Sequence, residues 1–154
     1  LTLGGEAPVQ VIWQTGKFYE REMQEFLAAH PTKNIWQGAF IDRMDYAYEI
    51  ADVVISRSGA CTVSELCLVA KPTIFVPSPN VAEDHQTKNA RALVEKEAAM
   101  MVSDAEATDC GIATALKMVS DKKLLERLSN NIAKLATPDA ADSVADEIVK
   151  LIEK

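Results

Sequence analysis

A short polar segment at residues 56–61 has the composition of a ligand-binding loop. It reads Ser-Arg-Ser-Gly-Ala-Cys and directly follows the β-branched run 53–55. A helix is expected after it, so the main-chain amides of Ala60, Cys61 and Thr62 would lack acceptors within that helix. Such amides, at the positive end of the helix dipole, bind phosphate groups. The segment therefore predicts a site for a phosphorylated ligand.

The same segment also has a purely structural interpretation. Thr62 and Glu65 fit the Ser/Thr-x-x-Glu capping box, which would begin a helix over residues 62–70. Glu65 has a second role open to it, because a carboxylate accepts hydrogen bonds from two vicinal hydroxyls, as acidic residues do with ribose in nucleotide-binding folds. Arg57 would either pair with an acid inside the fold or reach a phosphate. The spacing leaves these alternatives open.

A second polar segment, residues 83–89, follows the next hydrophobic run and begins another expected helix. Its two acids suit the positive end of the helix dipole. Gln86 and Asn89 are three residues apart and share a helix face, as His85 does with Asn89 at a spacing of four. Amide side chains both donate and accept hydrogen bonds, as sugar hydroxyls do. The segment predicts either a sugar-binding face or an ordinary solvated first turn.

Short hydrophobic runs alternate with helical periodicity, which is typical of an α/β fold with a Rossmann-like parallel sheet and helices on both faces. Strands are expected at 9–13, 34–38, 53–55, 73–76 and 99–102. Helices are expected at 18–29, 42–50, 62–70, 84–96, 105–119, 121–136 and 139–153. Five strands are one fewer than in a full dinucleotide-type sheet, so a strand and a helix are expected before residue 1. The loops 38–42, 56–62 and 77–85 would share one rim of the sheet and converge on one ligand.

The composition is that of a globular protein, with 48% hydrophobic and 25% charged residues in 154, most simply one domain over 1–154. A net charge of −7 without a basic stripe argues against nucleic acid as a partner. No apolar run reaches the roughly 18 residues of a membrane span.

The three cysteines, Cys61, Cys67 and Cys110, show neither zinc spacing nor a disulfide framework, so reduced thiols in a cytoplasmic protein without a metal are expected. The start at Leu1, without an initiator methionine, indicates a piece of a longer protein.

Three blocks of the chain resemble the MurG family of bacterial glycosyltransferases. Residues 52–66, 71–77 and 85–90 read DVVISRSGACTVSEL, KPTIFVP and HQTKNA, and segments 13–16 and 40–42 also fit. The resemblance runs through essentially the whole chain and covers only the C-terminal, donor-binding half of a two-domain GT-B fold. It implies transfer of N-acetylglucosamine from UDP-N-acetylglucosamine to undecaprenyl-pyrophosphoryl-N-acetylmuramoyl-pentapeptide (lipid I) in peptidoglycan synthesis. The transfer would invert the anomeric centre and need no metal or other cofactor.

The resemblance also implies a role for each residue of the donor site. The main chain of Ile41 would hold uracil, Glu65 would bind the ribose hydroxyls, and Gln86 with Asn89 would bind the sugar. His85 stands where some relatives carry a further glutamine. The diphosphate-facing loop would consist of Ser58, Gly59, Ala60, Cys61 and Thr62. No residue of this half would be catalytic, because the general base and the lipid I site belong to the N-terminal domain.

By the same resemblance, this chain alone would bind the donor weakly and transfer nothing. The intact enzyme would be peripheral on the cytoplasmic face of the bacterial plasma membrane, without a transmembrane segment. Two other functions stay open. A UDP-sugar 2-epimerase would need acid–base carboxylates near the sugar, for which Glu83 and Asp84 are the candidates. A nucleotide-binding module without chemistry would need none.

Overall fold

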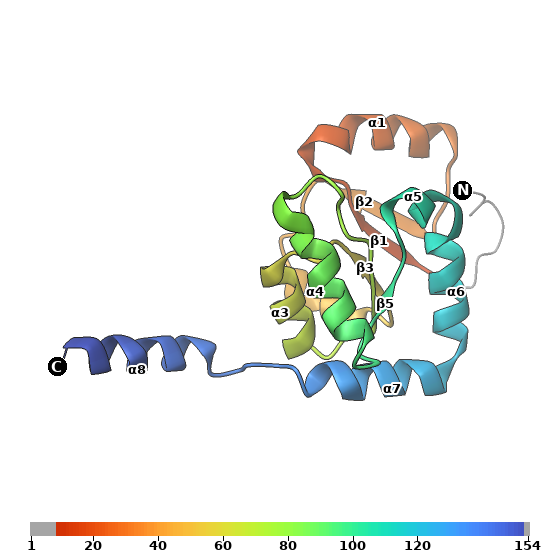
Figure 1. The fold of residues 1–154 in the computed structure, drawn as a ribbon. Coiled ribbons are helices and arrows are strands. Elements are labelled where there is room, and N and C mark those ends of the chain that lie inside the picture. Colours follow the sequence, from red (N-terminus) through yellow and green to blue (C-terminus); the bar gives the residue numbers. More distant parts are fainter. Residues whose placement is uncertain (1–8, 153–154) are drawn as a thin grey trace. The chain divides into compact units, whose positions relative to one another are not determined.

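The first of two compact units in the fold is a small parallel α/β layer. A computed structural model describes residues 9–152, and the chain divides into its two units after Ile50. Two parallel strands, paired with Ile12 opposite Trp36, are each followed by a helix (Figure 1). These elements are β1 (Val11–Gln14), α1 (Gly16–Ala29), β2 (Ile35–Gly38) and α2 (Met44–Ile50).

The second unit contains a three-stranded parallel sheet in the order β3-β4-β5, with α3 and α4 as its crossover helices (Figure 1). α3 and α4 contact each other, and α7 contacts both α3 and α6. Its strands are β3 (Val54–Ser56), β4 (Thr73–Phe75) and β5 (Met100–Met101). Its helices are α3 (Ala60–Leu68), α4 (His85–Val94), α5 (Asp104–Glu106), α6 (Ile112–Ser120), α7 (Lys122–Ala133) and α8 (Ala140–Ile152). A 3-10 turn, η1 (Ala82–Asp84), precedes α4, and a π-helical turn, η2 (Ala107–Gly111), joins α5 to α6.

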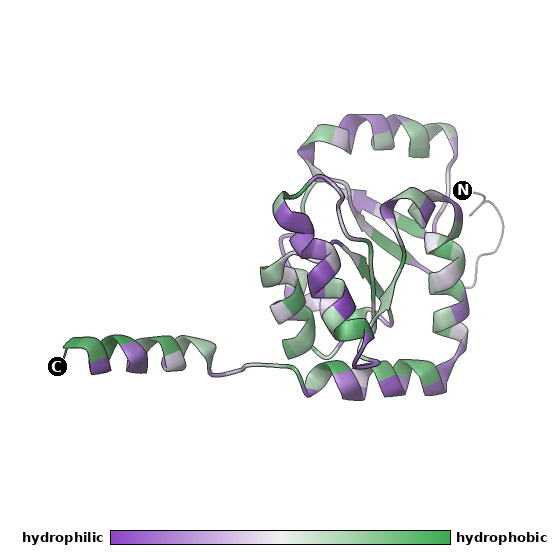
Figure 2. Ribbon diagram, in the orientation of Figure 1, coloured by the Kyte–Doolittle hydropathy of each residue, from purple (hydrophilic) through white to green (hydrophobic). Residues whose placement is uncertain are grey.

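The core of the second unit is built on strand β4. All three of its residues are buried, as the run of β-branched and aromatic side chains predicts for a central parallel strand. Ile74 packs in one cluster with Val102, Met118 and Leu128, so the sheet and the helices α6 and α7 share a core. The strands are correspondingly apolar, whereas the first turns of α4 are hydrophilic (Figure 2). A rigid base thus underlies the loops at the carboxyl ends of β3 and β4.

The α/β class and the parallel direction of every strand pair are confirmed. The sequence predicts one sheet, whereas the described strands form two sheets, one in the order β1-β2 and one in the order β3-β4-β5. Among these strands, β1 pairs only with β2, and β3 pairs only with β4. The helix expected over 105–119 is interrupted by η2, whose π-helical turn begins at Ala107. Asp121 caps α7 as expected, since its carboxylate accepts from the Leu124 amide at 3.0 Å. No helix within residues 9–152 is long and apolar enough to cross a membrane.

Replacing Ile74 by alanine is expected to lower the free energy of unfolding by about 2–5 kcal/mol, because loss of a fully buried side chain leaves a cavity. Ile148→Ala in α8 removes the same atoms from a side chain that is 53% exposed, and a change within about 0.5 kcal/mol is expected. Urea unfolding followed by circular dichroism measures both variants. Equal losses in the two would contradict the central position of β4.

Candidate functional site

Helix α3 begins at Ala60, two residues earlier than the sequence predicts. Gly59 occupies the N-cap position in an extended conformation, with φ −64° and ψ 149°, and its carbonyl accepts from the Val63 amide at 2.9 Å. No side chain caps the helix. Thr62 therefore lies inside the first turn, and the predicted capping box of Thr62 and Glu65 is wrong. The cause is local: the helix begins immediately after Gly59, so Thr62 lies three residues past the N-cap position and cannot serve as the cap.

The early start of α3 leaves its first amides available for a ligand. The first hydrogen bond within the helix is made by the Val63 amide. The N–H groups before it, those of Ala60, Cys61 and Thr62, have no acceptor within the helix, and the N-cap residue Gly59 offers no side chain to accept from them. Cys61 is exposed, so the surface at this helix end is open to solvent. The partial positive charge of the helix end and these donors together favour an anion.

Ser58 joins this loop to the start of α4. The Ser58 side chain is fully buried, and its hydroxyl donates to the main-chain oxygen of Gln86 at 2.8 Å. In return, Asn89 Nδ2 donates to the main-chain oxygen of Ser58 at 3.0 Å. These two bonds bring the loop after β3 to the start of α4, the helix that follows the loop after β4. Because its hydroxyl is buried and engaged, Ser58 is a connecting residue of the site in this structure.

Ser78 is a site residue that the sequence analysis missed. Its main-chain amide donates to Gln86 Oε1 at 2.9 Å, which holds the Gln86 side chain against the loop after β4. The signal was present in the sequence: Pro77 and Pro79 have no N–H, so Ser78 carries the one amide of that tripeptide. Such a donor needs an acceptor, and a nearby amide side chain supplies it.

Arg57 pairs with an acid, which is the first of the two roles that the sequence leaves open for it. Its Nη1 donates to the main-chain oxygen of Val76 at 3.0 Å and forms an ion pair with Asp104 at the start of α5. Arg57 therefore braces the loop before α3 against the end of β4 and against α5. Asp104 was not singled out from the sequence, because no local pattern connects residues that are 47 positions apart.

The remaining predicted residues of the second unit lie around the same two helix starts. Glu65 is exposed in the second turn of α3. His85 is the first residue of α4, and its ring Nδ1 donates to the Ala82 carbonyl at 2.7 Å. Glu83 and Asp84 both have left-handed backbone conformations, with φ of 52° and 53°, and both are exposed. Asp84 takes the N-cap position of α4 as expected, but its side chain makes no capping hydrogen bond.

Ile41 lies in the first unit, directly after β2. Its amide donates to Gln14 Oε1 at 3.0 Å, so Gln14 is a second residue that the sequence analysis missed. The Arg43 guanidinium stacks 3.7 Å above the Tyr46 ring and pairs with Asp45, and this partner lowers the pKa of the Asp45 carboxyl. Seven residues of this unit surround an apolar hollow of about 320 Å³: Ile12, Trp36, Ile41, Arg43, Tyr46, Ala47 and Ile50.

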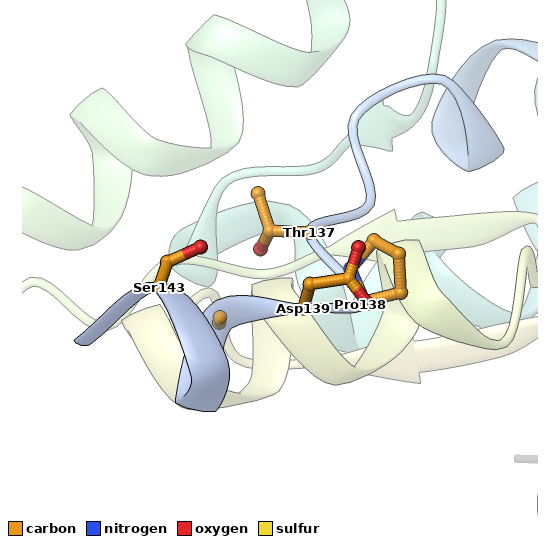
Figure 3. A pocket seen from close by; sticks show the side chains of 5 residues that line it. Thr137, Pro138, Asp139 and Ser143 are labelled. Carbon is orange, nitrogen blue, oxygen red and sulfur yellow. The ribbon is translucent and has the colours of Figure 1, made fainter. Parts of the chain in front are cut away.

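A larger hollow, of about 440 Å³, lies beside the turn between α7 and α8 (Figure 3). One continuous stretch of chain lines it, with Thr137, Pro138, Asp139, Ala140 and Ser143. None of the residues that the sequence predicts for the site lines this hollow, which is the concave side of a turn in the chain. Size alone therefore does not identify the functional site. Within residues 9–152, no group of three or more His, Cys, Asp and Glu side chains is placed to hold a metal ion.

Nucleotide-binding α/β folds combine a parallel sheet with polar loops that lead from the strands into the helices, and this chain has that arrangement. Comparison with known families agrees. The chain belongs to the glycosyltransferase family 28 C-terminal domain family, whose model matches residues 2–144.

Two relatives carry the name UDP-N-acetylglucosamine–N-acetylmuramyl-(pentapeptide) pyrophosphoryl-undecaprenol N-acetylglucosamine transferase. The protein of Parabacteroides distasonis is 56% identical over 146 residues, which are 95% of this chain and 40% of that protein. The protein of Porphyromonas gingivalis is 52% identical over 148 residues, 96% of this chain and 39% of that protein. The chain thus spans about two fifths of the length of these curated relatives.

Two solved structures have the same fold. The crystal structure of Acinetobacter baumannii MurG matches with a TM-score of 0.79 at 31% identity, over 92% of this chain and 43% of that one. The glycotransferase of kitacinnamycin matches with a TM-score of 0.61 at 20% identity, over 89% and 34% of the two chains, and supports the fold alone. The Rossmann-like class, as the C-terminal half of a GT-B glycosyltransferase, is confirmed.

Thr62→Ala is expected to change the free energy of unfolding by no more than about 0.5 kcal/mol, because Thr62 does not cap α3 and alanine favours a helix interior. Asp121→Ala is expected to cost about 0.5–2 kcal/mol, because it removes the cap of α7. Thermal or urea unfolding measures both. A loss at Thr62→Ala as large as that at Asp121→Ala would reinstate the capping box.

Proposed function

We propose that this chain is the donor-binding domain, over residues 1–154, of an enzyme that transfers N-acetylglucosamine from UDP-N-acetylglucosamine to lipid I. The observation that carries the proposal is the Ser58 connection, which brings the uncapped start of α3 to the amide side chains of α4. The names of relatives that are about half identical over nearly the whole chain support this choice of donor and acceptor.

Each part of the donor is assigned to a group of suitable chemistry. The diphosphate accepts hydrogen bonds from the helix-start amides of residues 60–62, with Gly59 allowing a close approach. Glu65 binds the ribose hydroxyls, and Gln86 with Asn89 binds the sugar. His85 flanks that sugar face. Uracil is assigned to the main chain of Ile41 on family resemblance, and its carbonyl is the group left for the base, because Gln14 occupies the amide.

The mechanism is direct displacement at the anomeric carbon by a hydroxyl of the acceptor, in the intact enzyme. This chain orients the donor and stabilises the departing UDP, because negative charge grows on the diphosphate as the bond breaks. The start of α3 is suited to that charge, since its dipole and amides need no rearrangement during the reaction. The acceptor and the general base are assigned to the part of the relatives that this chain does not cover. That part is also assigned the peripheral attachment to the cytoplasmic face of the membrane.

Bound UDP is expected to slow the alkylation of Cys61 several-fold, because the nucleotide would cover the exposed start of α3. Cys110, half-buried elsewhere in the unit, serves as the internal control and should react at the same rate with and without UDP. Cys67 should stay unmodified, because burial raises the pKa of its thiol. Timed iodoacetamide labelling with peptide mass spectrometry gives all three rates. Undiminished labelling of Cys61 at saturating UDP would refute the diphosphate assignment.

Glu65→Ala is expected to lower the affinity for UDP about tenfold or more, because hydrogen bonds to a charged group contribute about 1.5–3 kcal/mol. Glu126→Ala, an exposed glutamate of α7, is the matched control and should leave the affinity unchanged. Isothermal titration calorimetry with UDP measures the chain and both variants. Equal affinities in the chain and Glu65→Ala would remove Glu65 from the ribose site.

For the longer enzyme, disaccharide formation from UDP-N-acetylglucosamine and a lipid I analogue separates a transferase from an epimerase, which would release an epimeric sugar nucleotide.

A further inference from the structure

The hydrogen-bond polarity of the two amide side chains on α4 follows from their partners. The Ser78 main-chain N–H can only donate, so the Gln86 atom that faces it at 2.9 Å is the carbonyl oxygen Oε1. The Ser58 main-chain oxygen can only accept, so the Asn89 atom that faces it at 3.0 Å is the amide nitrogen Nδ2. Neither amide can be reversed without placing like groups against each other.

Each side chain therefore keeps one defined group for a ligand. Gln86 keeps its NH₂ group, a donor, and Asn89 keeps its carbonyl oxygen, an acceptor; within residues 9–152 neither group has another hydrogen-bond partner. Both side chains are half-buried, and their spacing of three places them on one face of α4. The face thus offers one wholly unengaged donor group, the NH₂ of Gln86, and one wholly unengaged acceptor, the carbonyl oxygen of Asn89.

We propose that Ser58 and Ser78 are positioning residues that hold this donor–acceptor pair for the hydroxyls of the donor sugar. One hydroxyl accepts from Gln86 Nε2 and another donates to Asn89 Oδ1, or a single hydroxyl does both. This inference rests on the proposed function, because the sugar of the UDP-sugar is the ligand. It assigns the Ser58 side chain to sugar selectivity through α4, in place of direct contact with the diphosphate.

The Ser58 hydroxyl can be removed without leaving a buried group unpaired. Its acceptor, the Gln86 carbonyl, lies in α4, where the regular i to i−4 pattern of the helix also uses that carbonyl. Ser129 makes the same kind of bond far along the chain, with its hydroxyl donating to the Ala70 carbonyl at 2.7 Å. Ser129→Ala is therefore a matched control for the general effect of losing one serine-to-carbonyl bond.

The test compares the affinities of this chain for UDP-N-acetylglucosamine and for UDP, by calorimetry or NMR titration. Ser58→Ala is expected to lower the ratio of the two affinities roughly three- to tenfold, as loss of about one hydrogen bond in the sugar contact predicts. Gln86→Glu keeps the acceptor for Ser78 but loses the donor, and should lower the ratio at least as much. Ser129→Ala should keep it. A ratio that Ser58→Ala leaves unchanged would overturn the inference, as would an equal weakening of both ligands.

A measurement without ligand tests the positioning directly. Exchange of the Ser78 amide hydrogen should be slow in the unmodified chain and faster in Gln86→Ala and in Ser58→Ala, but not in Ser129→Ala. Exchange that is equally fast in all four proteins would overturn the inference. Failure of the proposed function looks different: the Ser78 amide would be protected, yet the unmodified chain would bind neither UDP nor UDP-N-acetylglucosamine, and the sugar assignment would fall with it.

Discussion

Two hydrogen bonds of one buried serine join the parts of the candidate site. Through its hydroxyl and its carbonyl, Ser58 is bonded to Gln86 and Asn89, so the loop after β3 and the start of α4 are held in one arrangement. Both bonds lie in a partly dry environment, where hydrogen bonds are stronger than in water and an unmade one is costly. A helix start that favours anions and a helix face that suits hydroxyls are adjacent for this reason, and a sugar diphosphate carries both kinds of group.

Other contacts hold this connection in place. Arg57, next to Ser58, is bonded to the end of β4 and paired with Asp104, and the Ser78 amide holds Gln86 from the loop after β4. Beneath them, β4 is buried on every residue and packs on α6 and α7 through the Ile74 cluster. Loops that bind ligands need such a rigid base, because each misplaced donor loses most of its contribution to binding.

The strands could be predicted from the sequence because their signal is local. Runs such as 53–55 and 73–76 are β-branched or aromatic and flanked by polar or proline residues, and the alternation with helices predicts parallel pairing. The start of α3 was predicted two residues too late, because the residue types of a capping box, here Thr62 and Glu65, can also occur within a helix without capping it. The hydrogen bonds of Ser58 join residues about 30 positions apart in the sequence, and the ion pair between Arg57 and Asp104 joins residues that are 47 positions apart. No spacing rule reaches that far. Ser58 and Arg57 were therefore singled out from the sequence, whereas Asp104 and the hydrogen bonds that connect these residues were not.

Chemical-shift mapping by ¹⁵N NMR tests the central claim most directly, because it reports the helix start and the amide side chains in one titration. UDP is predicted to shift the main-chain amides of residues 60–62, and UDP-N-acetylglucosamine is predicted to shift these and also the side-chain NH₂ of Gln86. Shifts that avoid both places and cluster instead around the turn at residues 137–143 would contradict the account.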